Sequence, residues 1–319
     1  MDSTDYAIYR HLSQDGLVRI WASRRLVDPR VSVREIADAV GLSEAGVRSR
    51  LQGLKTRGLL RGTEVSLNPS LFGASVMTTE VPIRDTRESE QLLQDLSTVD
   101  GVLFARDILE EASRPVNVFH IADTPSATAR RSALLRRLSP TRTIRGPSPY
   151  WIPESTRSPT PLEWRLLAAF RKNPDATLGQ FAERVGVSLK TAARRYGLLI
   201  DSHACWWSHS SDSEEWPLAL LLIRLRRGTE AAAVSDQLSR RLDSWLPVAA
   251  DGLGVDPRLP DLPLCGLIPA ERPVALERAI RGVLGIYGVE GVRRTFGLGS
   301  KTYPEWIDEQ LASTLARVR

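Results

Sequence analysis

The chain has few of the side chains that build disulfides and metal centres. Its 319 residues include only two cysteines and four histidines. Cys205 and Cys265 belong to no metal-ligand spacing, which excludes a disulfide framework and a cysteine-based zinc site. No apolar run approaches the ~18 residues of a membrane-spanning helix, and no basic-then-apolar leader opens the chain. These absences favour a cytoplasmic protein with no metal and no membrane partner.

Charge of one sign is only slightly in excess. The formal net charge is +5, with 25% charged and 42% hydrophobic residues, which is ordinary for a folded protein. A small positive excess favours an acidic partner without identifying it. The length allows two to four small domains.

One stretch, residues 32–60, carries a complete local pattern. Its apolar positions recur at the three-and-four spacing of a helix face, first at Ile36, Ala37 and Val40 and then at Val47, Leu51 and Leu54. Gly41 suits the left-handed backbone at a helix end, and Ser43 can cap the next helix. The pattern predicts a helix-turn-helix, a motif whose second helix lies in the major groove of DNA.

The second predicted helix has the charge that DNA contact requires. Five cations stand against one acid between positions 44 and 61, giving 5 − 1 = +4: Arg48, Arg50, Lys55, Arg57 and Arg61 against Glu44. We expect the N-terminal side chains to approach bases and the remaining cations to hold phosphates. The base-reading set is Ser43, Glu44, Ala45 and Arg48, and the phosphate set is Arg50, Lys55, Arg57 and Arg61. The alternative is an ordinary helical hairpin with a solvated basic face.

The N-terminal 75 residues resemble the leucine-responsive regulatory protein/AsnC (Lrp/AsnC) family of transcription regulators. The resemblance rests on two runs, Leu42-Ser43-x-x-x-Val47-x-x-Arg50-Leu51-x-x-Leu54-x-x-x-Gly58-x-Leu60 and Leu67-Asn68-Pro69-x-x-x-Gly73. It implies a winged helix-turn-helix over 1–73, with a hairpin over 60–67. Residues 17–30 look like an insertion relative to the family's usual spacing. The family's second part is a ferredoxin-like domain that dimerises and often binds an amino acid.

The pattern after position 74 predicts such a domain over 74–146. Extended runs and amphipathic runs alternate in the order strand–helix–strand–strand–helix–strand, over 76–83, 86–96, 101–108, 116–121, 126–138 and 141–145. Residues 147–161 hold five prolines, at 147, 149, 153, 159 and 161, and we expect a linker there.

The helix-turn-helix pattern then starts again. A shift of 145 positions places Gly41 on Gly186 and Ser43 on Ser188, which indicates an internal duplication. We expect a second winged helix-turn-helix over 162–216, with a divergent wing. Its candidate DNA contacts are Lys190, Thr191, Arg194 and Arg195. The alternative is a packing module that has kept the shape of the motif.

A second ferredoxin-like pattern covers 217–300, and 301–319 adds a C-terminal helix. Strands are expected over 218–225, 247–253, 262–268 and 291–296, and helices over 230–245 and 273–284. The predicted fold class is α+β, with two winged helix-turn-helix domains alternating with two ferredoxin-like (RAM-type) α/β domains.

No catalytic constellation stands out. The histidines are scattered at 11, 120, 203 and 209, and no glycine-rich phosphate loop is present. We therefore expect no enzyme activity and no cofactor. Two alternatives stay open: an enzyme like the siroheme decarboxylases, tandem proteins of this architecture that act on a tetrapyrrole, or a ligand-sensing module that does not bind DNA.

The favoured function is a sequence-specific, DNA-binding transcription regulator. Its expected partners are double-stranded DNA, a small amino-acid-like effector whose binding residues the sequence does not indicate, and further copies of the chain through the ferredoxin-like domains. Whether the two halves pair within one chain or between two chains is open at this stage.

Overall fold

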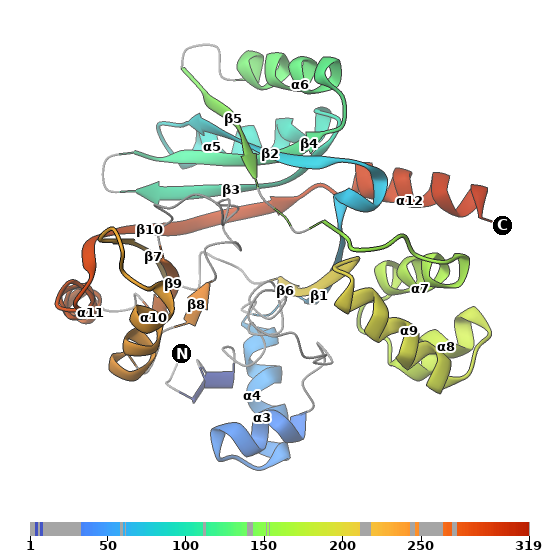
Figure 1. Ribbon diagram of the computed structural model, residues 1–319, viewed down its shortest axis with the longest axis horizontal. Coiled ribbons are helices and arrows are strands. Elements are labelled where there is room, and N and C mark those ends of the chain that lie inside the picture. The colour runs from blue at the N-terminus through green and yellow to red at the C-terminus, as the bar shows by residue number, and fades with distance from the viewer. Residues whose placement is uncertain are drawn as a thin grey trace. The chain divides into compact units, whose positions relative to one another are not determined.

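A computed structural model describes most of the chain. The described residues are 4–5, 7–8, 33–57, 60, 62–110, 113–138, 143–150, 152, 154–210, 218–242, 246–248, 264–269 and 273–318. The chain divides into two compact units (Figure 1). Unit 1 comprises Met1–Gly73, Pro153–Asp212 and Ile307–Arg319, and unit 2 comprises Ala74–Ile152 and Ser213–Trp306. Among the described residues, none of the helices has the length and apolar character needed to span a bilayer.

The first helix-turn-helix lies in unit 1. It consists of α3 (Val33–Val40) and α4 (Glu44–Thr56), in the places that the sequence predicts. Gly41 between them has a φ of 69°, a left-handed conformation that glycine adopts without a side-chain clash. The facing apolar side chains are buried, namely Ile36, Ala37, Val47 and Leu54. Their burial holds the two helices together and turns the other face of α4 outward.

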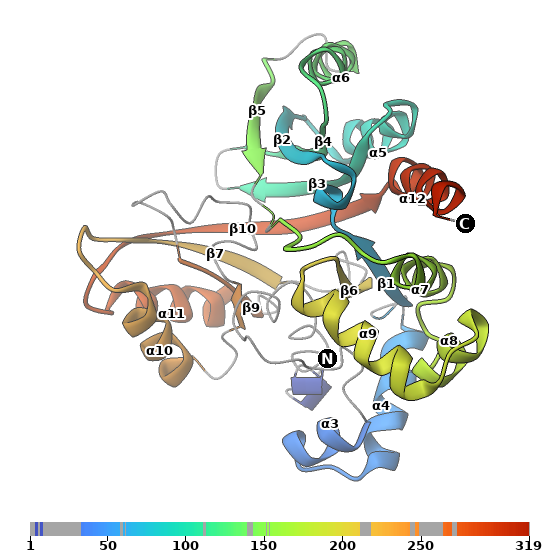
Figure 2. The same cartoon turned by 45° about the vertical axis from the view of Figure 1, so that its right-hand side comes forward.

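A second set of three helices lies in the same unit (Figure 2). It consists of α7 (Pro161–Lys172), α8 (Leu178–Val185) and α9 (Leu189–Asp201). Gly186, between α8 and α9, has a φ of 73° and occupies the same place as Gly41. Phe170 of α7 packs edge-to-face on Phe181 of α8, with ring centroids 4.7 Å apart. The turn geometry of the first helix-turn-helix is thus repeated in α8 and α9.

The wing differs from the predicted hairpin. Strand β1 (Gly62–Leu67) pairs antiparallel with β6 (Cys205–Ser210), which follows α9, so each helix-turn-helix contributes one strand. Asn68 reinforces the pairing, because its backbone N–H donates to the carbonyl of Ala204 at 2.9 Å and its side-chain amide donates to that of His203 at 2.8 Å. The two helix-turn-helix motifs are therefore joined within one chain.

Unit 2 contains an eight-stranded sheet built from two runs of elements in the same order. The first run is β2 (Ser75–Pro82), α5 (Thr86–Asp95), β3 (Val102–Glu110), β4 (Pro115–Ala122), α6 (Pro125–Leu138) and β5 (Arg145–Tyr150). The second run is β7 (Leu218–Leu225), α10 (Ala231–Arg241), β8 (Leu246–Val248), β9 (Leu264–Pro269), α11 (Pro273–Leu284) and β10 (Val289–Thr302). The strand order is β5-β2-β4-β3-β10-β7-β9-β8.

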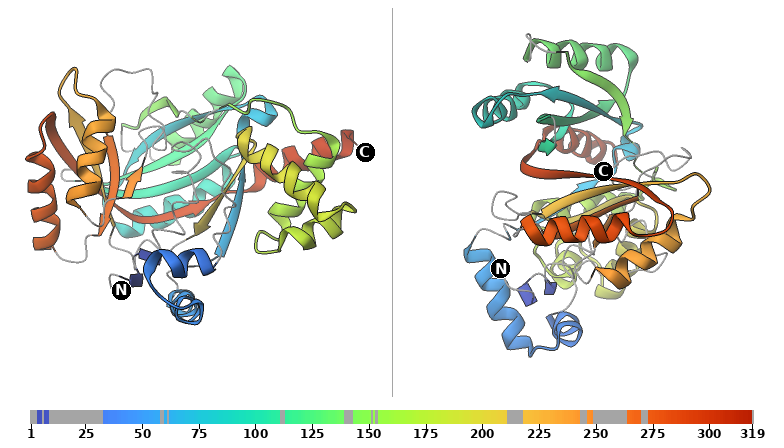
Figure 3. Two further views of the ribbon diagram at one scale, coloured as in Figure 1. Left: turned by 60° about the horizontal axis from the view of Figure 1, so that its bottom comes forward. Right: turned by 90° about the vertical axis from the view of Figure 1, so that its left-hand side faces the viewer.

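One long strand connects the two runs. The first part of β10 pairs with β7 of its own run, and the second part pairs with β3 of the other, with Phe296 opposite both Ala219 and Leu109. In each run both helices pack on the same face of the sheet (Figure 3). The cores include Leu92 and Leu135 in the first run and Leu238 and Val283 in the second. The second helix of the first run, α6, packs on β4.

The linker between the two units begins later than the sequence predicts. A strand was predicted over 141–145 and a linker from 147, whereas β5 extends from Arg145 to Tyr150 and pairs with β2. Because β5 is the outermost strand, one side of it needs no hydrogen-bond partner, and prolines are accepted there. Unit 2 accordingly continues to Ile152 before the chain enters unit 1.

Candidate nucleic-acid interface

The N-terminal end of α4 presents the predicted base-reading residues to solvent. The Ser43 hydroxyl accepts a hydrogen bond from the Gly46 N–H at 3.1 Å, which makes Ser43 the N-cap. Glu44, Ala45 and Arg48 are exposed. Arg48 and Glu44 form an ion pair of 3.3 Å in which both side chains are half or more exposed, so water screens it and it holds them only weakly.

Two of the predicted phosphate contacts have a protein partner instead. Arg50 donates to one carboxylate oxygen of Asp5 at 2.8 Å, and Arg57 donates to the other at 3.1 Å. Asp5 is only 6% exposed. A buried carboxylate needs compensating charge, so Arg50 and Arg57 neutralise Asp5 and fasten α4 to the helical residues around position 5. Both side chains stay partly exposed, so their contact with phosphates remains a prediction.

Lys55 is accessible for the phosphate contact that the sequence predicts. It is exposed, and it forms no ion pair with any residue that the structure describes. Arg61, the last predicted phosphate contact, lies outside the described residues. The outward face of α4 therefore offers an exposed N-terminal end at Ser43–Arg48 and one cation without an ion pair to a described residue, Lys55, in the last turn of the helix.

The second helix-turn-helix has a corresponding arrangement. Ser188 caps α9 by accepting from the Thr191 N–H at 3.2 Å, and Lys190 and Arg194 are exposed. Arg195, which the shift of 145 aligns with Arg50, donates to Glu163 at 3.3 Å. Like that of Arg50, its contact with DNA remains a prediction, now for a side chain that already pairs with a buried acid. Lys190 and Arg194 remain as the outward cations of α9.

Among the described residues of unit 1, Glu163 is the most deeply buried charged residue. Its side chain is fully buried and is held by Arg157 through two contacts of 2.8 and 2.9 Å. The backbone N–H of Thr160 also donates to it, at 2.7 Å. Burial alone raises the pKa of Glu163, but the hydrogen bonds from Arg157 and Thr160 outweigh burial and lower the pKa to about 2. Glu163 therefore stays charged under all ordinary conditions.

The sequence contains a signal for these two acids that the shift of 145 does not reveal. With a shift of 158 rather than 145, Asp5-Tyr6-x-Ile8 aligns with Glu163-Trp164-x-Leu166. Ile8 and Leu166 are both fully buried, in line with this alignment. The two alignments together place an acid, Asp5 or Glu163, and an arginine, Arg50 or Arg195, at equivalent positions of both motifs. This recurrence indicates an ion pair within each motif.

The described residues form no metal centre and no evident catalytic group. They contain no cluster of three or more potential metal ligands. His120 is fully buried, with one ring nitrogen 3.0 Å from the Thr79 hydroxyl, and burial lowers its pKa. Cys205 is buried, which raises the pKa of its thiol to about 12 and leaves it unreactive. His11 lies outside the described residues.

Comparison with known proteins confirms the resemblance of the N-terminal region. Residues 1–55 match the AsnC-type helix-turn-helix domain. The chain is 32% identical over 81 residues to the HTH-type transcriptional regulator LrpA of Pyrococcus abyssi, and equally to LrpA of Pyrococcus horikoshii. The matched part is 25% of this chain and 55% of each relative, so the chain spans about half the length of the curated relatives it matches.

Two kinds of solved structure are similar in fold. The siroheme decarboxylase NirDL, in co-complex with an iron-uroporphyrin III analogue, covers 96% of this chain and 99% of its own, with a TM-score of 0.49 and 11% identity. The Mycobacterium tuberculosis leucine response regulatory protein LrpA covers 50% of this chain and 100% of its own, with a TM-score of 0.31 and 21% identity.

These structures correct one expectation. The prediction that the chain is not an enzyme is contradicted, because the solved structures that span nearly all of it belong to a decarboxylase. At 11% identity the likeness concerns the fold alone.

Proposed function

We propose that this chain, whose N-terminal region carries an AsnC-type helix-turn-helix domain, is a sequence-specific DNA-binding transcription regulator of the Lrp/AsnC type. One observation carries the proposal: one face of α4 is held by buried side chains, while the residues at its N-terminal end are exposed. Val47 and Leu54 are buried and Arg50 is tied to Asp5, so the helix has one orientation. Ser43, Glu44, Ala45 and Arg48 then approach the bases, and Lys55 contacts a phosphate.

The proposal includes a fused, two-headed arrangement. Support comes from the recurrence of the helix-turn-helix turn at Gly41 and Gly186, and from the pairing of β1 with β6 within one chain. The two helix-turn-helix motifs differ in their exposed residues. The second presents Lys190 and Arg194 on α9, whereas the first presents the Glu44–Arg48 ion pair on α4. A chain with two different heads selects an operator whose half-sites differ.

The test is selection of binding fragments from random double-stranded DNA by the full chain, followed by affinity measurements at several salt concentrations. Lys55→Gln should weaken binding to all sequences and reduce the slope of log K against log salt by about one. Arg87→Gln is the matched control, because Arg87 is an exposed arginine of α5 in unit 2. Equal binding by the parent and the Lys55 variant at every salt concentration would reject the role of α4.

The two alternatives give different results in the same preparation. A tetrapyrrole enzyme would bind a porphyrin with a strong visible absorbance band and show no salt-dependent affinity for DNA. A sensing module without DNA contact would select no sequence from the random pool. Either result would replace the regulator as the leading assignment.

A further inference from the structure

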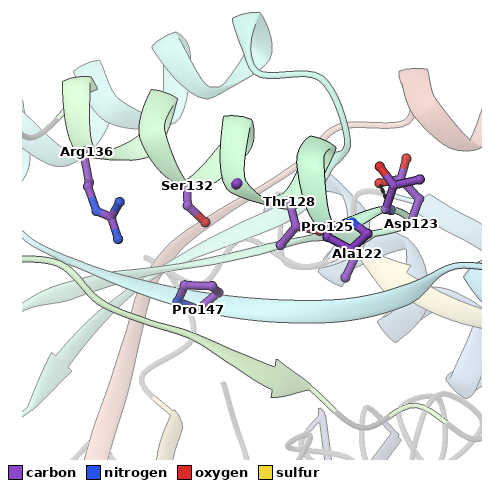
Figure 4. A pocket seen from close by; sticks show the side chains of 9 residues that line it. Ala122, Asp123, Pro125, Thr128, Ser132, Arg136 and Pro147 are labelled. Carbon is purple, nitrogen blue, oxygen red and sulfur yellow. Dashed lines mark hydrogen bonds between the residues drawn. The ribbon is translucent and has the colours of Figure 1, made fainter.

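A groove of about 540 Å³ opens between α6 and the edge strand β5 within unit 2 (Figure 4). Pro147 of β5 lies on one side, and the residues of α6 lie on the other. Sites for small molecules in proteins commonly enclose ~300–1,000 Å³. The groove is therefore large enough for a metabolite, and none of the DNA-binding residues lines it.

One face of α6 supplies a row of polar side chains to the groove. Thr128, Ser132 and Arg136 are spaced by four residues, which places them above one another on the helix. The adjoining face, with Arg131 and Leu135, is buried against the sheet. Figure 4 shows Ser132 and Arg136 directed from α6 toward the side of Pro147. Two hydroxyl groups and a guanidinium thus follow one another along the groove.

Ser132 is the strongest single indication of a ligand. The residue is only 5% exposed, yet its hydroxyl forms no hydrogen bond with any residue that the structure describes. Its Oγ is not one of the buried polar atoms that lack a partner, so the hydroxyl reaches the surface of the groove. It can therefore donate to or accept from a molecule bound there.

The charge balance indicates the sign of that molecule. Asp123, at the far end, is neutralised by Arg131 through contacts of 2.7 and 3.3 Å. The hydrogen bond from Arg131 lowers the pKa of Asp123 to about 2, so the two charges cancel at every ordinary pH. Arg136 is exposed and has no ion pair with a described residue. It is the uncompensated charge of the groove.

We propose that this groove binds a small hydroxylated organic acid. Its anionic head pairs with the Arg136 guanidinium, and its hydroxyl groups exchange hydrogen bonds with Ser132 and Thr128. Ala129 and Pro147 contact the carbon chain. Successive groups on α6 are ~6 Å apart along the helix axis, which suits a chain of three or four carbons. The head is a carboxylate or a phosphate monoester, since a guanidinium pairs with both.

The experiment follows backbone amide signals of the full chain by NMR during titration with glycerate and with glycerol 3-phosphate. Propionate has the acid without hydroxyls, and glycerol has hydroxyls without the acid. We expect the hydroxylated acids to shift signals from α6 and β5, propionate to bind more weakly, and glycerol to cause no shift. The stronger of the two acids identifies the head group.

Variants locate the site and keep the proposal falsifiable. Arg136→Gln should weaken binding at least about tenfold and Ser132→Ala about threefold to tenfold. Arg137→Gln is the matched control, because Arg137 is an exposed neighbour on α6 that does not line the groove. Ala129→Phe should fill the groove and abolish binding.

Three outcomes would overturn the proposal: no shift with either acid, equal losses for Arg136→Gln and Arg137→Gln, or unchanged binding in Ala129→Phe. All measurements are made without DNA. A negative result for the groove therefore leaves the proposed DNA binding untouched, and loss of DNA binding leaves the groove proposal untouched.

Discussion

Asp5 and Arg50 are 45 positions apart in the sequence, and a 2.8 Å hydrogen bond joins a carboxylate oxygen of one to the guanidinium of the other. Glu163 and Arg195 form the equivalent contact across 32 positions. The difference, 45 − 32 = 13 residues, falls where the insertion over 17–30 is expected. In both helix-turn-helix motifs a buried acid is thus bound to an arginine of the second helix, α4 or α9.

The first prediction concerns Asp5→Asn. The variant loses the negative charge and one of the two acceptor oxygens, so Arg50 and Arg57 repel each other without compensation, which should loosen α4 by about 1–3 kcal/mol. The measurement is hydrogen exchange of the α4 amides, which should speed up roughly tenfold or more. Asp38→Asn is the control, because Asp38 is exposed on α3 and forms no ion pair with a described residue. Equal protection in the variant and the parent would show that the pair is dispensable.

The second prediction separates reading from phosphate binding. Arg48→Ala removes an exposed side chain at the N-terminal end of α4 and should cost about 1–3 kcal/mol on the selected DNA sequence. The salt dependence should change little, in contrast to Lys55→Gln, and preference at one or two base positions should relax. Fragment selection repeated with the variant measures this. An unchanged consensus would place Arg48 away from the bases.

The third prediction is the acid stability of the second helix-turn-helix. The pKa of Glu163 is about 2 in the folded chain and about 4.5 when unfolded, so its stabilising effect is complete above pH ~4.5 and is lost as the pH falls toward 2. The shift of about 2.5 units corresponds to about 3 kcal/mol. The free energy of unfolding of Glu163→Gln, measured between pH 6 and 2, should depend less on pH than that of the parent.

Glu183→Gln is the control for that experiment, because Glu183 is exposed on α8. It should keep the parent's pH dependence. If Glu163→Gln also keeps it, another group is responsible for the acid sensitivity.

The fourth prediction concerns Gly101, whose backbone conformation strongly favours glycine. Gly101 has a φ of 76°, and a Cβ at this position would overlap the Arg131 guanidinium. Gly101→Ala should therefore displace Arg131 from the Asp100 carbonyl, which it contacts at 2.8 Å, and destabilise unit 2 by about 1–3 kcal/mol. Thermal unfolding measures the effect.

Gly282→Ala is the matched change in the same unit. Gly282 is a helical residue of α11 with open space around its Cα, so alanine there should stabilise by about 0.5–1 kcal/mol. A similar effect of both substitutions would show that neither the positive φ nor Arg131 constrains Gly101.

Local sequence was enough to predict the elements that depend on neighbouring residues. The helix faces at Ile36 and Val47, the caps at Ser43 and Ser188, and the glycine turns arise from contacts within a few positions, which a sequence pattern records directly. The edge strand β5 was read as linker, because its prolines are acceptable only where one side of the strand is free.

By itself, the sequence determined the helices and the turn of the first helix-turn-helix and the surplus of cations on α4, and it predicted the repetition after 145 positions. Only the tertiary structure decided which of those cations are free, because Arg50, Arg57 and Arg195 are neutralised by acids far away in the chain. It also decided that β1 pairs with β6 and β3 with β10. Strand pairing and ion pairing depend on distance in space, and a pattern along the chain does not contain that distance.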